Sequence, residues 1–290
     1  MNIKLELKLL IATSTLLVPA VQAETGPDFE RPITAANAPA TNTDSTGNSS
    51  ADLAMTLANP IGALISVPFQ NNYDFGAGPD GDGEQFKLNL QPIIPITLNE
   101  DWLLISRTIL PYVDQQDVIG TTSQSGLADT VQSFFLSPAK PTASGWIWGA
   151  GPAMLMPTAT DSLLGGEKWG VGPTAVALKQ EGGWTYGALA NHIWSFAGDD
   201  ARQDVSATYL QPFVSYTTKT STTFTLNTES TYDWTNDQWT LPLNLMVQQI
   251  VKIGDQPIAL TLGGRYYAEK PDDGPEWGLR FAIIFLFPRS

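Results

Sequence analysis

The sequence contains one histidine, His192, and a serine lies three residues further on at Ser195. A histidine that activates a serine nucleophile must come within about 3 Å of its hydroxyl group. Both residues lie in an expected β-strand, residues 184–196, where an odd spacing places two side chains on opposite faces. The sequence also has no cysteine, so thiol nucleophiles, disulfides and thiolate metal sites are excluded. We therefore predict that the protein is not an enzyme.

Five charged residues within the expected strands are candidates for positions inside the fold. A charged side chain is costly against lipid, so each must face a wet or ion-paired interior. Two interpretations stay open: an ion-paired network that fills and stiffens the interior, or a polar constriction that selects solutes. We expect Glu229 to be the carboxylate nearest to Arg265 and Arg280. The set comprises Arg107, Glu229, Arg265, Glu269 and Arg280.

Aspartates gather in the longer connections, for example at Asp199-Asp200 and Asp272-Asp273. Carboxylates are the hard oxygen ligands that Ca²⁺ prefers, but neither pair has the glycine-punctuated spacing of a dedicated calcium loop. We therefore predict solvated loop tips, with no metal site and no cofactor. Weak bridging to lipopolysaccharide through divalent ions is the alternative. A net charge of −14 argues against a nucleic-acid partner.

The last stretch of the chain, residues 276–287, shows which elements position these side chains. Every second residue from Trp277 to Phe287 is apolar, which indicates a strand with one continuously apolar face. At about 3.3 Å per residue and a tilt near 40°, it spans roughly 25 Å, the height of the apolar band of an outer-membrane barrel. Aromatic residues suit the two membrane interfaces. The predicted interface aromatics are Trp102, Tyr112, Trp239, Trp277 and Phe287.

The same rhythm of strand, turn, strand and longer loop recurs from residue 59 onward. Short turns on one rim and long loops on the other are typical of outer-membrane proteins. We therefore predict an all-β fold, a transmembrane antiparallel β-barrel of about twelve strands. The expected strands lie near residues 60–73, 84–98, 101–113, 126–137, 145–157, 169–180, 184–196, 205–217, 221–233, 239–252, 257–269 and 276–287.

The N-terminal part of the chain differs in composition from the rest. Residues 1–23 have a positive start, a short apolar run and the small-residue ending Val21-Gln22-Ala23, which predicts a cleaved signal peptide. Residues 24–58 are predicted to be a periplasmic linker, of which residues 24–50, rich in Thr, Ala, Asn, Pro and Ser, are expected to be disordered. A short helix over residues 52–57 is expected, either as a lead-in to the first strand or as a small plug. The barrel is assigned to residues 59–288.

Several local motifs point to a known family. Together they resemble the bacterial outer-membrane family named for the meta-pathway of phenol degradation, whose members are often labelled transporter or, misleadingly, neuromedin U. The resemblance covers residues 52–288 and implies a barrel with a transport role and no catalytic residues. The motifs include Asn59-Pro60-Ile61, Gln91-Pro92-Ile93-Ile94-Pro95, Trp148-Gly149-Ala150-Gly151-Pro152, Trp169-Gly170-Val171-Gly172-Pro173, Trp194-Ser195-Phe196-Ala197-Gly198 and Pro275-Glu276-Trp277-Gly278-Leu279-Arg280.

The barrel and the resemblance together predict a location and a function. We expect an outer-membrane channel or transporter for passive passage of small hydrophobic or aromatic solutes. The expected partners are outer-membrane lipids, lipopolysaccharide, the small-molecule solute and the barrel-insertion machinery, since the aromatic end of the last strand resembles an insertion signal. One alternative is a structural or adhesive barrel that acts through its acidic extracellular loops. A minor alternative is a lipid-modifying enzyme of the outer membrane.

Overall fold

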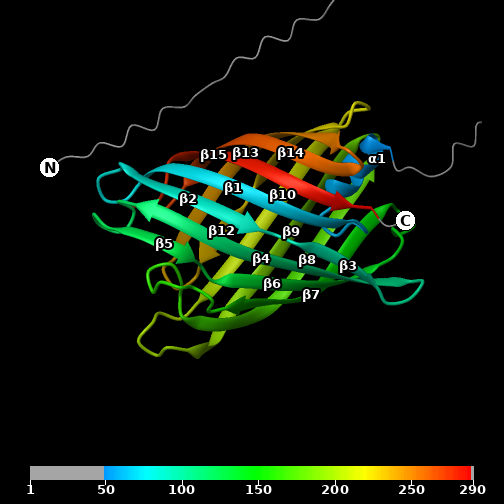
Figure 1. The fold of residues 1–290 in the computed structure, drawn as a ribbon. Helices are drawn as coiled ribbons and strands as arrows, with labels where there is room; N and C mark the ends of the chain where they lie inside the picture. The colour runs from blue at the N-terminus through cyan, green and yellow to red at the C-terminus, as the bar shows by residue number, and fades with distance from the viewer. Residues whose placement is uncertain (1–48, 289–290) are drawn as a thin grey trace, which may run out of the picture. The chain divides into compact units, whose positions relative to one another are not determined.

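The structure is a computed structural model that describes residues 49–288 (Figure 1). The signal peptide predicted for residues 1–23 and most of the linker predicted for residues 24–58 lie outside the described residues. No helix within residues 49–288 is long and apolar enough to cross a membrane. The elements are α1 (Ser50–Leu57), β1 (Ile65–Ala77), β2 (Gly83–Leu90), β3 (Ile93–Thr97), β4 (Trp102–Gln116), β5 (Ser123–Leu127), β6 (Thr130–Pro138), β7 (Trp146–Met156), β8 (Lys168–Glu181), β9 (Trp184–Gly198), β10 (Ser206–Thr217), β11 (Thr222–Thr228), β12 (Ser230–Asp233), β13 (Gln238–Ile253), β14 (Gln256–Glu269) and β15 (Trp277–Phe287).

The strands form one antiparallel sheet that closes on itself. β1 pairs with β15, from Ile65 opposite Phe287 to Phe75 opposite Trp277, so the first and last strands complete the ring. Three positions around the barrel are each occupied by two consecutive strand segments, which we count as one wall strand: β2 with β3, β5 with β6, and β11 with β12. Pro92 lies at the first of these breaks, where its missing N–H cannot continue the ladder. When each of these pairs is counted as one wall strand, the barrel has twelve strands, which confirms the predicted fold.

The connections give the barrel two different ends. The turns at 98–101, 139–145, 182–183, 218–221 and 254–255 join strands at one end, which we call the short-turn end. The other connections, including 117–122, 157–167, 199–205 and 270–276, lie at the long-loop end. The described chain starts and finishes at the short-turn end, because β1 leaves from it and β15 returns to it. This alternation is the one predicted from the sequence.

Burial alternates along the strands with a period of two. On β15, Gly278, Arg280 and Leu286 are buried, while Trp277 and Phe287 are exposed. The exposed face remains apolar around the wall: Leu262 of β14 is 65% exposed and Leu245 of β13 is 64% exposed. Aliphatic side chains this exposed in the middle of strands form a large apolar outer surface, which a water-soluble monomer avoids.

The described chain begins with a helix and a tight reversal. Ser49 accepts a hydrogen bond from the backbone N–H of Asp52, whose carboxylate accepts one from the backbone N–H of Ser49, and this capping box starts α1. After α1, the side-chain oxygen of Asn59 accepts a hydrogen bond from the backbone N–H of Ile61 (3.0 Å). The chain then enters β1 at Ile65, so residues 59–64, which the sequence analysis assigned to the barrel, precede the first strand.

Residues 50–64, which we call the plug, lie inside the short-turn end of the barrel. Leu53 and Ala54 of α1 are fully buried, and Ile61 is buried in a second cluster. Gln180 Nε2 of β8 also donates to the carbonyl oxygen of Met55 (2.7 Å). The apolar side chains around the plug fill this end of the interior. The first cluster adds Leu64, Ile250, Ala259, Ala282, Ile284 and Leu286, and the second adds Ile105, Phe135, Val176, Leu178 and Leu189.

Candidate functional site: a charged cavity inside the barrel

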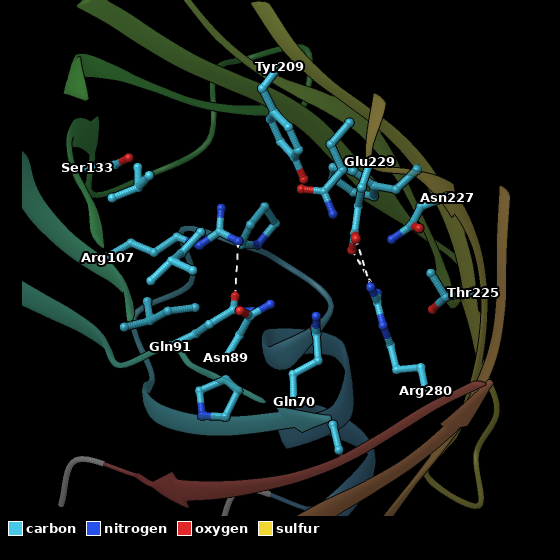
Figure 2. Close-up of a pocket in the computed structure, with 18 of the residues that line it drawn as sticks. Gln70, Asn89, Gln91, Arg107, Ser133, Tyr209, Thr225, Asn227, Glu229 and Arg280 are labelled. Carbon is cyan, nitrogen blue, oxygen red and sulfur yellow. Dashed lines mark hydrogen bonds and ion pairs between the residues drawn. The ribbon is translucent and has the colours of Figure 1, made fainter. Parts of the chain in front are cut away.

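A cavity of about 530 Å³ lies inside the barrel, bounded on one side by Leu57, Ala58 and Pro60 of the plug. Its walls combine aliphatic side chains with amides, hydroxyls and three charged residues. Figure 2 shows the charged side chains reaching into the cavity from different walls, with Tyr209 beside them. A volume between roughly 300 and 1,000 Å³ is typical of small-molecule sites. The charged residues that line it are Arg107, Glu229 and Arg280.

Arg280 and Glu229 form a bidentate ion pair across the inner face of the wall. Both nitrogen–oxygen distances are 2.7 Å, and the side chains are 3% and 19% exposed (Figure 2). Arg280 Nε also donates to Asn72 Oδ1 (2.7 Å). Gly263 of β14 is the cross-strand partner of Arg280 and has no side chain, so the guanidinium can cross β14 on its way to Glu229. The carboxylate expected nearest to Arg280 is therefore the one it contacts.

Arg265 has a different partner from the one expected. Arg265 Nη1 lies 3.1 Å from Asp74 Oδ2, and its Nε donates to Asn244 Oδ1 (3.1 Å). The expectation that Glu229 is the nearest carboxylate to Arg265 is wrong, because closure of the barrel brings β1 within reach of β14. Gly278 of β15 stands between them and is the cross-strand partner of both Asp74 and Arg265. The ion pair passes over a position that has no side chain.

We predict that Gly278→Val breaks this ion pair. A Cβ atom at Gly278 would lie 2.2 Å from Asp74 Oδ1 and 2.7 Å from the carbonyl oxygen of Tyr73. Separating a buried pair costs about 3–5 kcal/mol. The loss is measured by urea unfolding of the protein refolded in detergent micelles.

Gly264→Val is the matched control, because nothing lies within 4 Å of a Cβ atom added at Gly264. Its free energy of unfolding is expected to stay within about 0.5 kcal/mol of the wild-type value, as for ordinary surface substitutions. Equal losses in the free energy of unfolding of the two variants would show that the Asp74–Arg265 ion pair does not depend on the absence of a side chain at Gly278.

Arg107 is the charged residue of the cavity that has no carboxylate partner. Within residues 49–288 no Asp or Glu oxygen lies within 4.0 Å of its guanidinium. Its Nη2 donates to Gln91 Oε1 (3.3 Å), and its Nε is buried without a partner. Figure 2 shows the guanidinium extending toward the middle of the cavity. Arg107 was predicted to lie on the inner face of its strand, and its neighbours Ile105 and Ile109 share that face.

The remaining predicted residues lie away from this cavity. Glu269 is exposed at the last position of β14 and is not among the residues that line the cavity. His192 Nδ1 lies 2.7 Å from Thr208 Oγ1, whereas Ser195 Oγ donates to Asp204 Oδ1 (3.1 Å), so the two residues have separate partners on opposite faces of β9. Within residues 49–288 no group of three or more His, Asp or Glu side chains is placed to hold a metal ion.

The predicted interface aromatics are distributed over the outer surface. Tyr112, Trp239, Trp277 and Phe287 are between 39% and 46% exposed. Trp102 is half-buried at the short-turn end, where its ring makes an edge contact with Trp148 at 6.2 Å. Trp277 stacks on Phe75 at the long-loop end, with ring centroids 4.5 Å apart. Aromatic rings therefore lie at both ends of the apolar outer surface.

Asp74, Lys87 and Tyr209 are interior residues that were not predicted from the sequence. Alternation along β1 was the signal for Asp74, because Gln70 and Asn72 share its face and all three are polar. Lys87 faces inward as the cross-strand partner of Asn72. Tyr209 lines the cavity from β10, a strand in which both faces mix hydroxyl-bearing, apolar and aromatic residues, so alternation gave no clear inner face.

Comparison with known proteins supports the fold. No protein-family model matches the sequence, and no curated protein matches it. The structure is similar to that of an outer-membrane channel from Pseudomonas putida F1, with a TM-score of 0.60 and 17% identity over 77% of this chain and 94% of that one. It also matches outer-membrane phospholipase A from Escherichia coli (TM-score 0.46, 12% identity, 77% and 90% covered) and the KdgM porin (TM-score 0.40, 8% identity, 78% and 99% covered). The first likeness assigns the chain the fold of an outer-membrane β-barrel.

Proposed function

We propose that this protein is an outer-membrane channel that passes small hydrophobic or aromatic solutes without an energy source. The observation that carries the proposal is the mixed polar and apolar cavity of about 530 Å³ inside a closed barrel. If the interior side chains served only to fill the barrel, we would expect them to pack without a cavity of this size beside charged residues. The bilayer-facing side supplies the complementary feature, an apolar outer surface with aromatic residues at both ends.

The outer surface supports a location in the outer membrane. Its exposed leucines would contact lipid tails, and the acidic residues of the long-loop end, such as Asp199 and Asp200, would face the lipopolysaccharide side. β15 ends in Phe285, Leu286 and Phe287, which suits recognition by the barrel-insertion machinery. We also propose that the chain is a distant relative of the family named for the meta-pathway of phenol degradation, on the strength of the motifs quoted above.

The solute class follows from the cavity walls. Aliphatic side chains such as Ile93, Leu155 and Ile193 favour an apolar body, while the amides and hydroxyls around them bind polar substituents. The separation of His192 from Ser195 favours passage of solutes over their hydrolysis, because a general base must lie within hydrogen-bonding distance of the nucleophile that it activates.

Flux through liposomes tests this proposal. A phenyl glucoside is a suitable probe because it is aromatic and neutral, and its hydroxyl groups make unaided passage through lipid slow. Liposomes that contain the refolded protein are expected to take up the glucoside several-fold faster than protein-free liposomes of the same lipid. Uptake equal to that of protein-free liposomes, with the protein folded by heat-modifiability on gels, would overturn the channel.

The same assay separates the channel from an adhesive barrel. Removing the loop tip at residues 79–81, between β1 and β2, leaves the cavity intact. Unchanged glucoside uptake in this variant is expected of a channel. An adhesive barrel would show no uptake in either protein and would lose surface binding when the loop is shortened.

A further inference from the structure

The charges of the cavity do not cancel. Among the described residues that line it, Glu229 is neutralised by Arg280 at 2.7 Å, and Arg107 is left as an uncompensated positive charge. The whole chain carries a net charge of −14, so the positive charge of the cavity is opposite in sign to the net charge of the protein. Arg107 is partly buried and its Nε is fully buried, so an anionic ligand that supplied the opposite charge would offset the cost of leaving it unpaired.

Arg107 also has hydrogen-bonding capacity to spare. A guanidinium has five N–H donors, and the described contact is one bond to Gln91, at 3.3 Å. Its Nε lies buried with no partner in the described protein. The planar donor fork matches a carboxylate, which accepts two parallel hydrogen bonds. A phosphate monoester carries close to two negative charges near neutral pH, so it would leave one negative charge unbalanced in this cavity.

Aliphatic side chains make up part of the surroundings of Arg107. Ile93 of β3 is its cross-strand partner, and Ile109 lies two residues further along β4 on the same face. Leu155 and Ile193 line the same cavity from β7 and β9. A ligand held by its carboxylate at Arg107 would therefore rest its remaining atoms against aliphatic side chains. Burying that part is favourable by about 25 cal/mol for each Å² removed from water.

We propose that the cavity is a binding site for an organic acid with one carboxylate and an apolar body, held by Arg107. This inference rests on the proposed channel and narrows its solute class. The carboxylate accepts hydrogen bonds from the guanidinium of Arg107, and the hydrocarbon or aromatic part contacts Ile93, Ile109 and the neighbouring aliphatic residues. The Arg280–Glu229 pair stays neutral beside it.

Equilibrium binding to the full-length protein in detergent tests the site. The probes are 4-phenylbutyrate and its neutral amide, 4-phenylbutanamide, which differ in the group that would meet Arg107. Wild-type protein is expected to bind the carboxylate at least about tenfold more tightly than the amide, since charge-assisted hydrogen bonds are roughly twice as strong as neutral ones. Arg107→Gln is expected to abolish this preference, and Arg107→Lys to keep most of it. Lys219→Gln, which removes an exposed positive charge in a short turn, should leave it unchanged.

A second variant keeps the test decisive if Arg107→Gln does not fold. Ser133 is the cross-strand partner of Arg107 and lines the cavity, so Ser133→Asp would supply a carboxylate to Arg107 while retaining the arginine. This variant is also expected to lose the preference for 4-phenylbutyrate. Equal binding of acid and amide by the wild-type protein, or a preference that survives both Arg107→Gln and Ser133→Asp, would overturn the proposal.

The two proposals fail differently. If phenyl glucoside crosses liposomes but the acid shows no advantage over its amide, the channel stands and the carboxylate site is wrong. If no solute crosses but the acid is bound through Arg107, the site stands and the channel is wrong.

Discussion

Introducing two glutamates into the plug, Leu53→Glu with Ile61→Glu, is expected to raise single-channel conductance several-fold in planar bilayers. Leu53 and Ile61 are 3% and 2% exposed, and each is packed in one of the two apolar clusters that fill the short-turn end. A carboxylate buried in either cluster would lack a partner, at a cost of several kcal/mol. Displacing the plug from the barrel is expected to cost less free energy than burying the two carboxylates, because α1 is one short helix held by apolar packing and few hydrogen bonds to the wall.

The control for this experiment keeps the volume and the polarity of the plug. Leu53→Met with Ile61→Leu is a conservative exchange that costs less than about 1.5 kcal/mol at each site, so the plug should stay in place. Its conductance is expected to match that of the wild-type protein. A conductance that is the same in the glutamate variant and in the control would contradict the role of residues 50–64 as a constriction of the short-turn end.

Glu229→Ala is expected to destabilise the protein strongly. It leaves the guanidinium of Arg280, which is 3% exposed, without its carboxylate. Removing one partner of a buried ion pair costs about 3–5 kcal/mol, whereas replacing both partners by apolar residues is often neutral or stabilising. The double variant Glu229→Leu with Arg280→Leu should therefore recover most of the loss. Urea unfolding of protein refolded in micelles measures both, and the single variants Glu229→Leu and Arg280→Leu complete the double-mutant cycle.

Conductance separates two roles for this pair. If Arg280 and Glu229 shape a constriction, Arg280→Ala changes ion selectivity while the protein still shows heat-modifiability on gels. A variant that only loses folding would assign the pair to structural filling of the interior. A single-variant loss below about 1 kcal/mol, as for an exposed ion pair, would contradict the burial described here.

Much of the wall was predictable from the sequence because a barrel imposes one simple rule on every strand. Alternation placed Trp277 and Phe287 outside and Arg280 inside, and it separated Phe224 from Glu229 on the ninth wall. Loop lengths set the two ends, because antiparallel neighbours need only short turns at one rim. These signals are local, and each is repeated many times along the chain.

The arrangement of the interior was less predictable because it depends on closure. Asp74 and Arg265 are 191 positions apart, and they meet because β1 pairs with β15 in one register, with Gly278 between them. The helix of the plug follows from its capping residues, Ser49 and Asp52, but its inward position depends on the space that the wall leaves free. That Arg107 has no carboxylate partner within residues 49–288 could be inferred only after the partners of the other arginines were known.

Selective blocking of the cavity tests the central claim that solutes cross through the inside of this barrel. The chain has no cysteine, so Thr225→Cys and Leu226→Cys each provide one thiol for a bulky methanethiosulfonate reagent. Thr225 lines the cavity, whereas its neighbour Leu226 is 51% exposed on the outer surface. We predict that the reagent strongly reduces phenyl glucoside uptake by liposomes that contain Thr225→Cys and leaves uptake by Leu226→Cys unchanged. Unchanged uptake after complete labelling at position 225, or equal inhibition at both positions, would contradict a pathway through the interior.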